Sequence, residues 1–259
     1  MNGIIELGFW QVLSAYIFVL IVIVVIRVRG IKRELDVLIA SVRMTLQLMI
    51  TGYILVYVFN NPHPLLTISI IIVMEAFSIG TIFTKFKKRL SGGLKKVIIA
   101  AMGTGSILCM VYFLLAVVRI DPWYDPRYFI PIAGMLIGNS MTGISLGIKN
   151  LLDGMTSGKA LVEEALILGA TPRKATKAIL DNAFDAAILP TINSMLGMGV
   201  VFLPGMMTGQ IISGTSPTIA ITYQMAVMLG ILGTVSLTVI ISLHFGYRTF
   251  FNKEAQLIH

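Results

Sequence analysis

Two ionisable residues lie within long apolar runs of the sequence, where a charged side chain is costly. Arg43 lies eight residues into one run, and Glu75 lies nine residues from the end of the next. At about 1.5 Å of rise per helical residue both lie roughly 12 to 14 Å inside, with Gln47 one turn beyond Arg43 on the same helix face. A charge near the centre of a bilayer costs about 2.5 to 3.5 kcal/mol and usually has a function. Arg43 and Glu75 therefore predict either a buried ion pair between antiparallel helices or a charged position on a transport pathway.

A second set of residues combines amide and thioether side chains in apolar segments. Amide oxygens and thioether sulfurs can line a path for a metal ion, although thioethers prefer soft ions such as Cu(I) and methionine is also a common packing residue. Metal coordination, a pathway of other chemistry and simple packing all stay open, and the metal ligands are unknown. Together with Arg43, Gln47 and Glu75, the predicted transport pathway comprises Asn139, Met141, Asn193, Met206, Met207, Gln210 and Gln224.

The sequence lacks the residues that nucleotide hydrolysis or covalent catalysis needs. A phosphate-binding loop reads G-x-x-x-x-G-K-[ST], whereas Gly158 and Lys159 are followed by Ala160 and have no glycine at the required earlier position. The single cysteine, Cys109, lies in an apolar run, and the three histidines are far apart in the sequence, which argues against a Cys/His or Ser/His/Asp site. We expect a chain that is not an enzyme and that carries no cofactor of its own.

The composition indicates an integral membrane protein. The 259 residues are 56% hydrophobic and only 12% charged, with a mean hydropathy of +0.89, whereas soluble domains contain about 25% charged residues. The net charge of +8 comes from basic residues in short runs between apolar segments, without the interleaved aromatic residues of a nucleic-acid site. We therefore expect an all-α polytopic membrane protein that contacts membrane lipid and has no nucleic-acid partner.

Apolar runs of about 20 residues, the length that crosses a bilayer as a helix, recur along the chain. The segment 204–217 between the last two runs is uncharged, rich in glycine and proline and too short to cross, so we expect it to be re-entrant or interfacial. Residues 130–152 contain two pairs of glycines four residues apart, which allow close packing either inside the chain or at a dimer or pore contact. About seven transmembrane helices are predicted, over residues 7–26, 35–59, 65–84, 97–118, 130–152, 186–203 and 219–245.

The distribution of lysine and arginine predicts the orientation in the membrane. Assigning the loops alternately to the two sides places 17 of the 20 basic residues on one side, two (Arg119 and Arg127) on the other, and Arg43 within a span. Because cytoplasmic loops carry the excess of basic residues, we expect the N-terminus outside and the C-terminus in the cytoplasm, in a bacterial inner (cell) membrane. The densest basic patch follows the third span and comprises Lys85, Lys87, Lys88, Arg89, Lys95 and Lys96.

A short amphipathic helix and turn, residues 158–172 (GKALVEEALILGATP), lie between the fifth and sixth spans on the predicted cytoplasmic side. We call this segment the elbow. Gly169 is expected to end its helix in a left-handed conformation, with Thr171 and Pro172 as N-cap and first residue of the next helix. Lys159, Glu163 and Glu164 are expected to point away from the protein. The face expected to lie on apolar protein comprises Ala160, Leu161, Ala165, Leu168 and Gly169.

The spacing Glu164-Ala165-x3-Gly169 in the elbow resembles the motif of the cytoplasmic coupling helix of ABC-transporter permeases, although Leu166 stands where that motif usually has alanine. Longer segments resemble the FetB (YbbM) family of ABC permeases over most of the chain. They are IPIAGMLIGNSM (130–141), LGATPRKA (168–175), AAILPTINSM (186–195), VVFLPGMMTGQIISGTSP (200–217) and YQMAVM (223–228). This resemblance implies a homodimer of permeases, a role in iron efflux and, in plant relatives, a role in aluminium tolerance.

The same resemblance implies a separate ATP-binding subunit, which binds ATP and Mg and docks on the elbow. The coupling positions implied in this chain are Glu163, Glu164, Ala165, Leu168, Gly169, Ala170, Thr171 and Pro172. We expect residues 1–259 to form a single transmembrane permease domain with a role in metal ion homeostasis. The alternative is an ATP-independent secondary transporter or channel, in which the elbow is a surface helix lying on the membrane.

Overall fold

The computed structural model describes residues 7–87 and 89–258, so Lys88 of the predicted basic patch and residues 1–6 and 259 lie outside it. The regular elements within these ranges are helices, which confirms the all-α class. The chain divides into two compact units, one up to Asn61 and one from Pro62 onward, and each is described by itself. The expectation of a single permease domain stays a prediction.

The first unit contains two long helices, α1 (Phe9–Val28) and α2 (Glu34–Asn60). The hydroxyl of Tyr16 on α1 forms hydrogen bonds with the hydroxyl of Thr45 and the carbonyl of Ser41 on α2. No residue of α1 is buried, although the helix is almost entirely apolar. A helix that is apolar on all sides belongs in lipid or against other protein.

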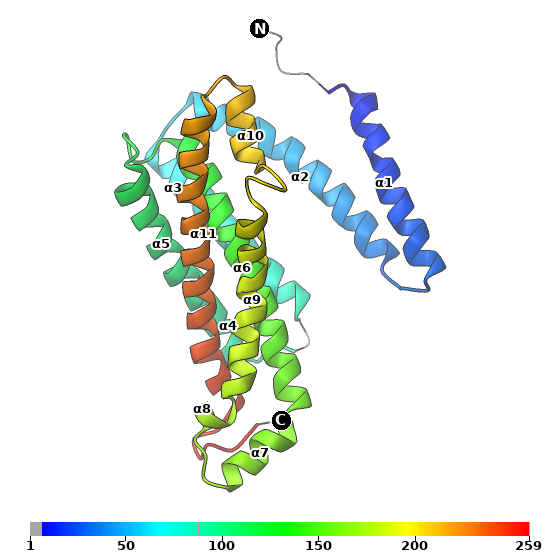
Figure 1. Cartoon of the computed structure of the whole chain (residues 1–259), viewed down its shortest axis with the longest axis vertical. Coiled ribbons are helices and arrows are strands. Elements are labelled where there is room, and N and C mark those ends of the chain that lie inside the picture. Colours follow the sequence, from blue (N-terminus) through cyan, green and yellow to red (C-terminus); the bar gives the residue numbers. More distant parts are fainter. Residues whose placement is uncertain (1–6, 88, 259) are drawn as a thin grey trace. The chain divides into compact units, whose positions relative to one another are not determined.

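The second unit is a bundle whose long helices run side by side (Figure 1). It begins with α3 (Pro64–Lys85) and a continuous helical span over 92–118, in which α4 (Gly92–Ala100) and α5 (Ile107–Tyr112) are each followed by a π-helical stretch. The remaining long helices are α6 (Pro126–Ser157), α9 (Lys177–Gly197) and α11 (Pro217–Gly246), which continues into the short helix η3 (Tyr247–Phe250). Proline at the first turn of α3, α6 and α11 fits these helix starts, because the amide it lacks has no partner there.

Helix α6 is at the centre of this bundle and packs on α3, α9 and α11. A Cβ atom added at Gly143 would lie 2.7 Å from Cγ1 of Val235 on α11, and one added at Gly147 would lie 3.5 Å from Cβ of Ala187 on α9. Close packing of α6 against α9 and α11 within the chain therefore explains why glycine stands at these two positions. A Cβ at Gly138 would have nothing within 4 Å, which leaves room on that face of α6.

The first five predicted spans match helices α1, α2, α3, α4–α5 and α6, and the last predicted span matches α11. These six segments are long and apolar enough to cross a membrane. The boundaries predicted for the sixth span, 186–203, are wrong. Its helix, α9, begins at Lys177 and ends at Gly197, and residues 198–204 are not helical. Gly199 adopts a φ of +84°, which interrupts the helix although the following residues are apolar. The total of seven spans stays a prediction.

Two short helices mark one end of the second unit and a third marks the other end. Helices α7 (Lys159–Ile167) and α8 (Pro172–Ala175) lie at the opposite end of the bundle from α10 (Gly205–Ile212) (Figure 1). The helix ends beside α7 and α8 carry most of the basic residues, whereas Arg119 and Arg127 lie at the α10 end. Because α10 is an eight-residue helix that turns directly into α11, the segment 204–217 does not cross the bundle, as expected.

Candidate functional site

The elbow has the turn that its sequence predicts. Gly169 has a φ of +87°, its amide donates to the Leu166 carbonyl at 2.9 Å, and the Ala170 amide donates to the Ala165 carbonyl at 2.9 Å. These two hydrogen bonds satisfy carbonyls at the end of α7 that would otherwise lack a partner. The Thr171 hydroxyl then accepts from the Lys174 amide at 3.4 Å, and Pro172 is the first residue of α8.

The prediction of which face of α7 packs on the protein is wrong. Val162 is the buried residue of α7, whereas the side chains of Leu161, Ile167 and Leu168 are 72%, 84% and 87% exposed. Ala160 and Gly169 are also exposed, and Ala165 is half-buried. The short connection from α6 through Gly158 sets the rotation of α7, so that apolar periodicity alone cannot define its buried side. The elbow therefore presents an apolar tip, defined here as Leu161, Ile167 and Leu168.

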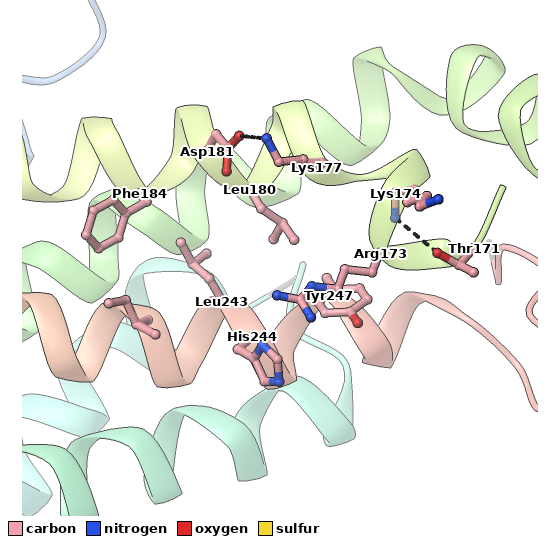
Figure 2. A pocket seen from close by; sticks show the side chains of 11 residues that line it. Thr171, Arg173, Lys174, Lys177, Leu180, Asp181, Phe184, Leu243, His244 and Tyr247 are labelled. Carbon is pink, nitrogen blue, oxygen red and sulfur yellow. Dashed lines mark hydrogen bonds and ion pairs between the residues drawn. The ribbon is translucent and has the colours of Figure 1, made fainter.

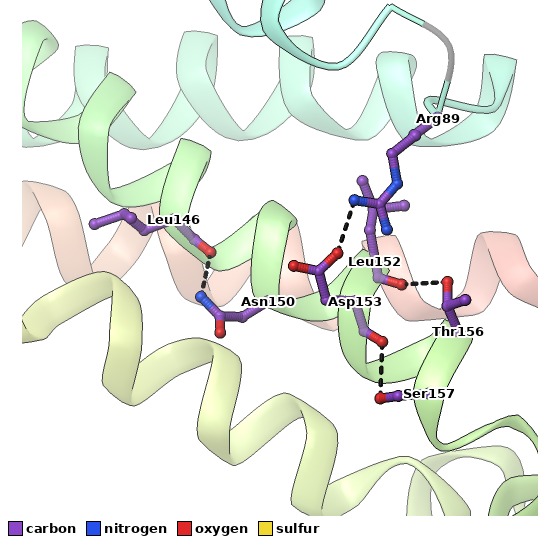
Figure 3. A network of polar contacts seen from close by, with 7 residues as sticks. All are labelled: Arg89, Leu146, Asn150, Leu152, Asp153, Thr156 and Ser157. Carbon is purple, nitrogen blue, oxygen red and sulfur yellow. Dashed lines mark hydrogen bonds and ion pairs between the residues drawn. The ribbon is translucent and has the colours of Figure 1, made fainter. Parts of the chain in front are cut away.

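Close contacts hold the end of α6, which leads into the elbow. A Cβ atom at Gly154 near the end of α6 would lie 2.6 Å from Cγ2 of Ile179 on α9, so only glycine permits this approach. Arg89, in the loop before α4, forms an ion pair with Asp153 of α6 at 2.7 Å, and the Ser157 hydroxyl donates to the Asp153 carbonyl (Figure 3). These contacts hold the end of α6, which leads directly into α7, against α9 and the loop before α4.

A polar stripe runs along α6. Asn139, Thr142, Lys149 and Asp153 are exposed, and their spacing of three, seven and four residues places them on one helix face. The Asn139 side chain donates to the Met135 carbonyl at 2.7 Å. Such a face in a membrane helix lies against water or protein, because charged and amide groups are costly in lipid. Of these four residues only Asn139 is predicted from the sequence as a pathway residue, although the other three stand at helical spacing from it.

Helix α9 carries matching polar residues. Asn182, Asp185 and Asn193 are exposed. The contacts of Gly154 with Ile179 and of Gly147 with Ala187 show that α6 and α9 are antiparallel. This register places Asn193 at about the level of Asn139, and Asp185 at about the level of Lys149, so the polar residues of the two helices lie at similar depths.

The break after α9 exposes apolar side chains. Within residues 198–204 the amides of Gly199 and Val201 donate to the carbonyls of Phe202 and Gly197, which forms a compact turn. Val200 is 92% exposed and Val201 is 80% exposed. Since the eight residues of α10 rise about 12 Å, the break lies roughly that far from the end of the bundle. Irregular backbone at such depth is tolerated where protein covers it or where it lines a water-filled cavity.

Buried amides lie beyond the break, where α10 packs on α11. In the part of the chain that the structure describes, the Oε1 atoms of Gln210 and Gln224 and the hydroxyl of Tyr223 are buried and have no hydrogen-bond partner. Met207 is buried, and Met206 is half-buried. Unpaired buried acceptors are rare because they cost free energy. They are the groups that a passing ligand or water would satisfy.

Glu75 lies in a different part of the bundle. Its carboxylate is buried and accepts a hydrogen bond of 3.0 Å from the Ser106 hydroxyl. Arg43 and Gln47 line the same hollow on α2, which confirms that they share a face. Because Arg43 belongs to the first unit and Glu75 to the second, the ion pair between them stays a prediction.

The predicted pathway residues thus fall into separate groups: on the first unit, beside Ser106, along α6 and α9, and at the α10–α11 contact. Met141 is half-buried against the core. Among residues 7–87 and 89–258, no three His, Cys, Asp or Glu side chains lie together as a metal site would require. A metal ion on this pathway would therefore meet mainly amide, hydroxyl and single carboxylate oxygens.

Comparison with known proteins gives consistent matches over almost the whole chain. A family described as "Uncharacterised protein family (UPF0014)" matches residues 9–251. The chain is 33% identical over 244 residues to "Probable iron export permease protein FetB" of Escherichia coli (strain K12), covering 94% of this chain and 92% of the relative.

Two further relatives come from a second bacterium and from a plant. The chain is 34% identical to "UPF0014 membrane protein YjkA" of Bacillus subtilis (strain 168), covering 93% of this chain and 94% of the relative. It is 32% identical to "Protein ALUMINUM SENSITIVE 3" of Arabidopsis thaliana, covering 94% and 88% respectively. No solved structure matches the chain.

Proposed function

This chain belongs to the UPF0014 family of membrane proteins, and we propose that it is the permease subunit of an ATP-driven transporter. The observation that carries the proposal is the elbow, whose apolar tip is exposed at the basic end of the bundle. Exposed apolar side chains on a helix with a fixed orientation suit docking into a cleft of a partner protein. The partner would be a separate ATP-binding subunit that binds ATP and Mg.

The contacts at the end of α6, next to the elbow, support a mechanism that couples the ATP-binding subunit to the bundle. When the ATP-binding subunit closes, it moves α7, and Gly154, Asp153 and Ile179 carry that movement to α6 and α9. These two helices bear the polar stripe, so their displacement shifts the balance between inward-facing and outward-facing states. Glu163 and Glu164, beside the apolar tip, would contribute charge to the contact with the partner.

A second copy of the chain completes the pathway in this proposal. In a homodimer, α9 and the break at residues 198–204 face the same elements of the partner protomer, which covers Val200 and Val201. The polar stripes of the two copies then enclose a water-accessible path. Asn139, Asn193 and Asp185 would line it, with Gln210 and Gln224 at its outer end.

Iron is the substrate that we propose, since the Escherichia coli relative is named "Probable iron export permease protein FetB". Amide and carboxylate oxygens suit a hard cation better than thioethers do. The charge distribution supports a cytoplasmic elbow and C-terminus and an N-terminus outside, in a bacterial inner membrane. Metal ion homeostasis follows from an exporter of this kind.

An ATP-independent transporter or channel is the alternative, because the same apolar tip suits a helix that lies on the membrane surface. Replacement of Leu168 by aspartate separates the two functions. Leu168 is 87% exposed, so Leu168→Asp leaves the fold intact. For the ATP-driven permease we expect binding of the ATP-binding subunit to fall at least tenfold, about 1.4 kcal/mol, in pull-down and titration experiments.

Ile31→Asp is the matched control, because Ile31 is an exposed apolar residue in another loop predicted to be cytoplasmic. This control is expected to keep full affinity for the ATP-binding subunit. Equal affinity of Leu168→Asp and the unchanged chain would remove the docking assignment.

A further inference from the structure

A hollow of about 560 Å³ opens beside the elbow, between the start of α9 and the end of α11 (Figure 2). Arg173, Lys174 and Lys177 line its α8–α9 side. A neighbouring hollow of about 320 Å³ shares Arg173 and adds Arg248 and Lys253. The side chains that line the two hollows thus include five cations.

One carboxylate partly balances these cations. Asp181 lies 3.2 Å from the Lys177 ammonium group in an ion pair that is largely exposed to solvent. Because solvent-exposed ion pairs contribute little free energy, Lys177 remains available to bind an anion. Since no second acidic residue among those that the structure describes lines either hollow, the described lining of the two hollows carries a net positive charge.

The inner wall of the larger hollow is apolar. Leu180 and Phe184 of α9 line it together with Ile240 and Leu243 of α11, and Leu180 lies opposite Leu243 (Figure 2). From Lys177 to Phe184 the helix rises about 10 Å toward the middle of the bundle. The cations therefore lie at the end of the bundle, and the apolar wall lies nearer to its middle.

We propose that this hollow binds an anionic glycerophospholipid, with the headgroup phosphate on Arg173, Lys174 and Lys177 and one acyl chain along Leu180, Phe184 and Ile240. Phosphate groups bind preferentially where basic side chains gather between helices at the cytoplasmic membrane surface. A free phosphate would use the cations and leave the apolar wall uncovered, so the wall favours the lipid. The proposal depends on the proposed membrane orientation in one respect: that orientation decides from which leaflet the lipid comes.

The experiment measures phosphatidylglycerol bound to the purified chain in nanodiscs of phosphatidylcholine with increasing phosphatidylglycerol, by native mass spectrometry. The triple variant Arg173→Gln, Lys174→Gln, Lys177→Gln is expected to lose affinity by about fivefold for each cation removed. Lys87→Gln, Lys95→Gln, Lys96→Gln removes equal charge from the same end of the bundle, and this control is expected to keep the bound lipid.

A second variant and a competitor distinguish a lipid site from a phosphate site. Ile240→Asn is expected to weaken binding of phosphatidylglycerol, and inorganic phosphate is expected not to displace the lipid. The proposal is overturned if the triple variant and its control bind equally, or if inorganic phosphate displaces the lipid and Ile240→Asn has no effect. It is also overturned if the triple variant retains the lipid and loses only the ATP-binding subunit, because the cations would then belong to that interface. Failure of the permease proposal would leave these lipid measurements unchanged.

Discussion

At the scale of single residues, buried polar groups within the spans differ in how they are satisfied. Oε1 of Glu75 accepts from the Ser106 hydroxyl, whereas Oε2 of Glu75 and Oε1 of Gln210 and Gln224 have no hydrogen-bond partner in the described part of the chain. A satisfied buried group holds two helices together, and an unsatisfied one is available to a ligand. We therefore expect Oε1 of Glu75 to link α3 to the helix after α4, and Oε2 of Glu75 and the two glutamines to be available to a ligand.

Ser106→Ala tests the first assignment. Removing the hydroxyl leaves Oε1 of the buried Glu75 without this donor, which is expected to cost about 1 to 3 kcal/mol of stability. The measurement is thermal unfolding in detergent. Ser242→Ala is the control, because the Ser106 hydroxyl also bonds the Met102 carbonyl of its own helix and the buried Ser242 hydroxyl makes the same kind of bond, to Val239 at 2.9 Å. Equal losses in the two variants would show that the bond to Glu75 has no special importance.

At the scale of elements, the main irregularity of the bundle is the break between α9 and α10. Gly199 with its left-handed backbone and Pro204 before α10 prevent one continuous helix. If a second copy covers the break, cysteines placed there in two protomers lie close together. Val200→Cys in a Cys109→Ala background is expected to give an oxidised dimer in membranes. Leu229→Cys is the control, because Leu229 lines a hollow against α5 and not the break.

Cross-linking is read on a non-reducing gel. The homodimer with α9 at its centre predicts a dimer band for Val200→Cys and a monomer for Leu229→Cys. Equal cross-linking at both positions, or at Leu229 alone, would contradict this arrangement.

The sequence predicts most elements because long apolar runs have one structural solution in a membrane. The turn of the elbow was also predictable, since Gly169, Thr171 and Pro172 each favour one backbone position. The end of α9 was not, because Val200 to Leu203 remain apolar while Gly199 interrupts the hydrogen bonds. The rotation of α7 and the gathering of Lys174 and Tyr247 around one hollow depend on tertiary contacts, which no local pattern contains.

At the scale of the whole molecule, the second unit carries three groups of features in order along its bundle. The end with the elbow carries most of the basic charge and the apolar tip, the middle carries the polar faces of α6 and α9, and the opposite end carries the break and α10. An ATP-binding partner at the first end would act on the middle through Gly154 and Asp153. Transport by such a protein would require ATP.

Transport by proteoliposomes tests this claim most directly. The purified chain is reconstituted with its ATP-binding subunit, and iron movement across the membrane is followed with a metal-sensitive dye, with and without ATP. We predict transport that requires both ATP and the subunit and that falls at least tenfold with Leu168→Asp. Equal transport by the chain alone, without ATP and unaffected by Leu168→Asp, would contradict the account and establish an ATP-independent transporter or channel.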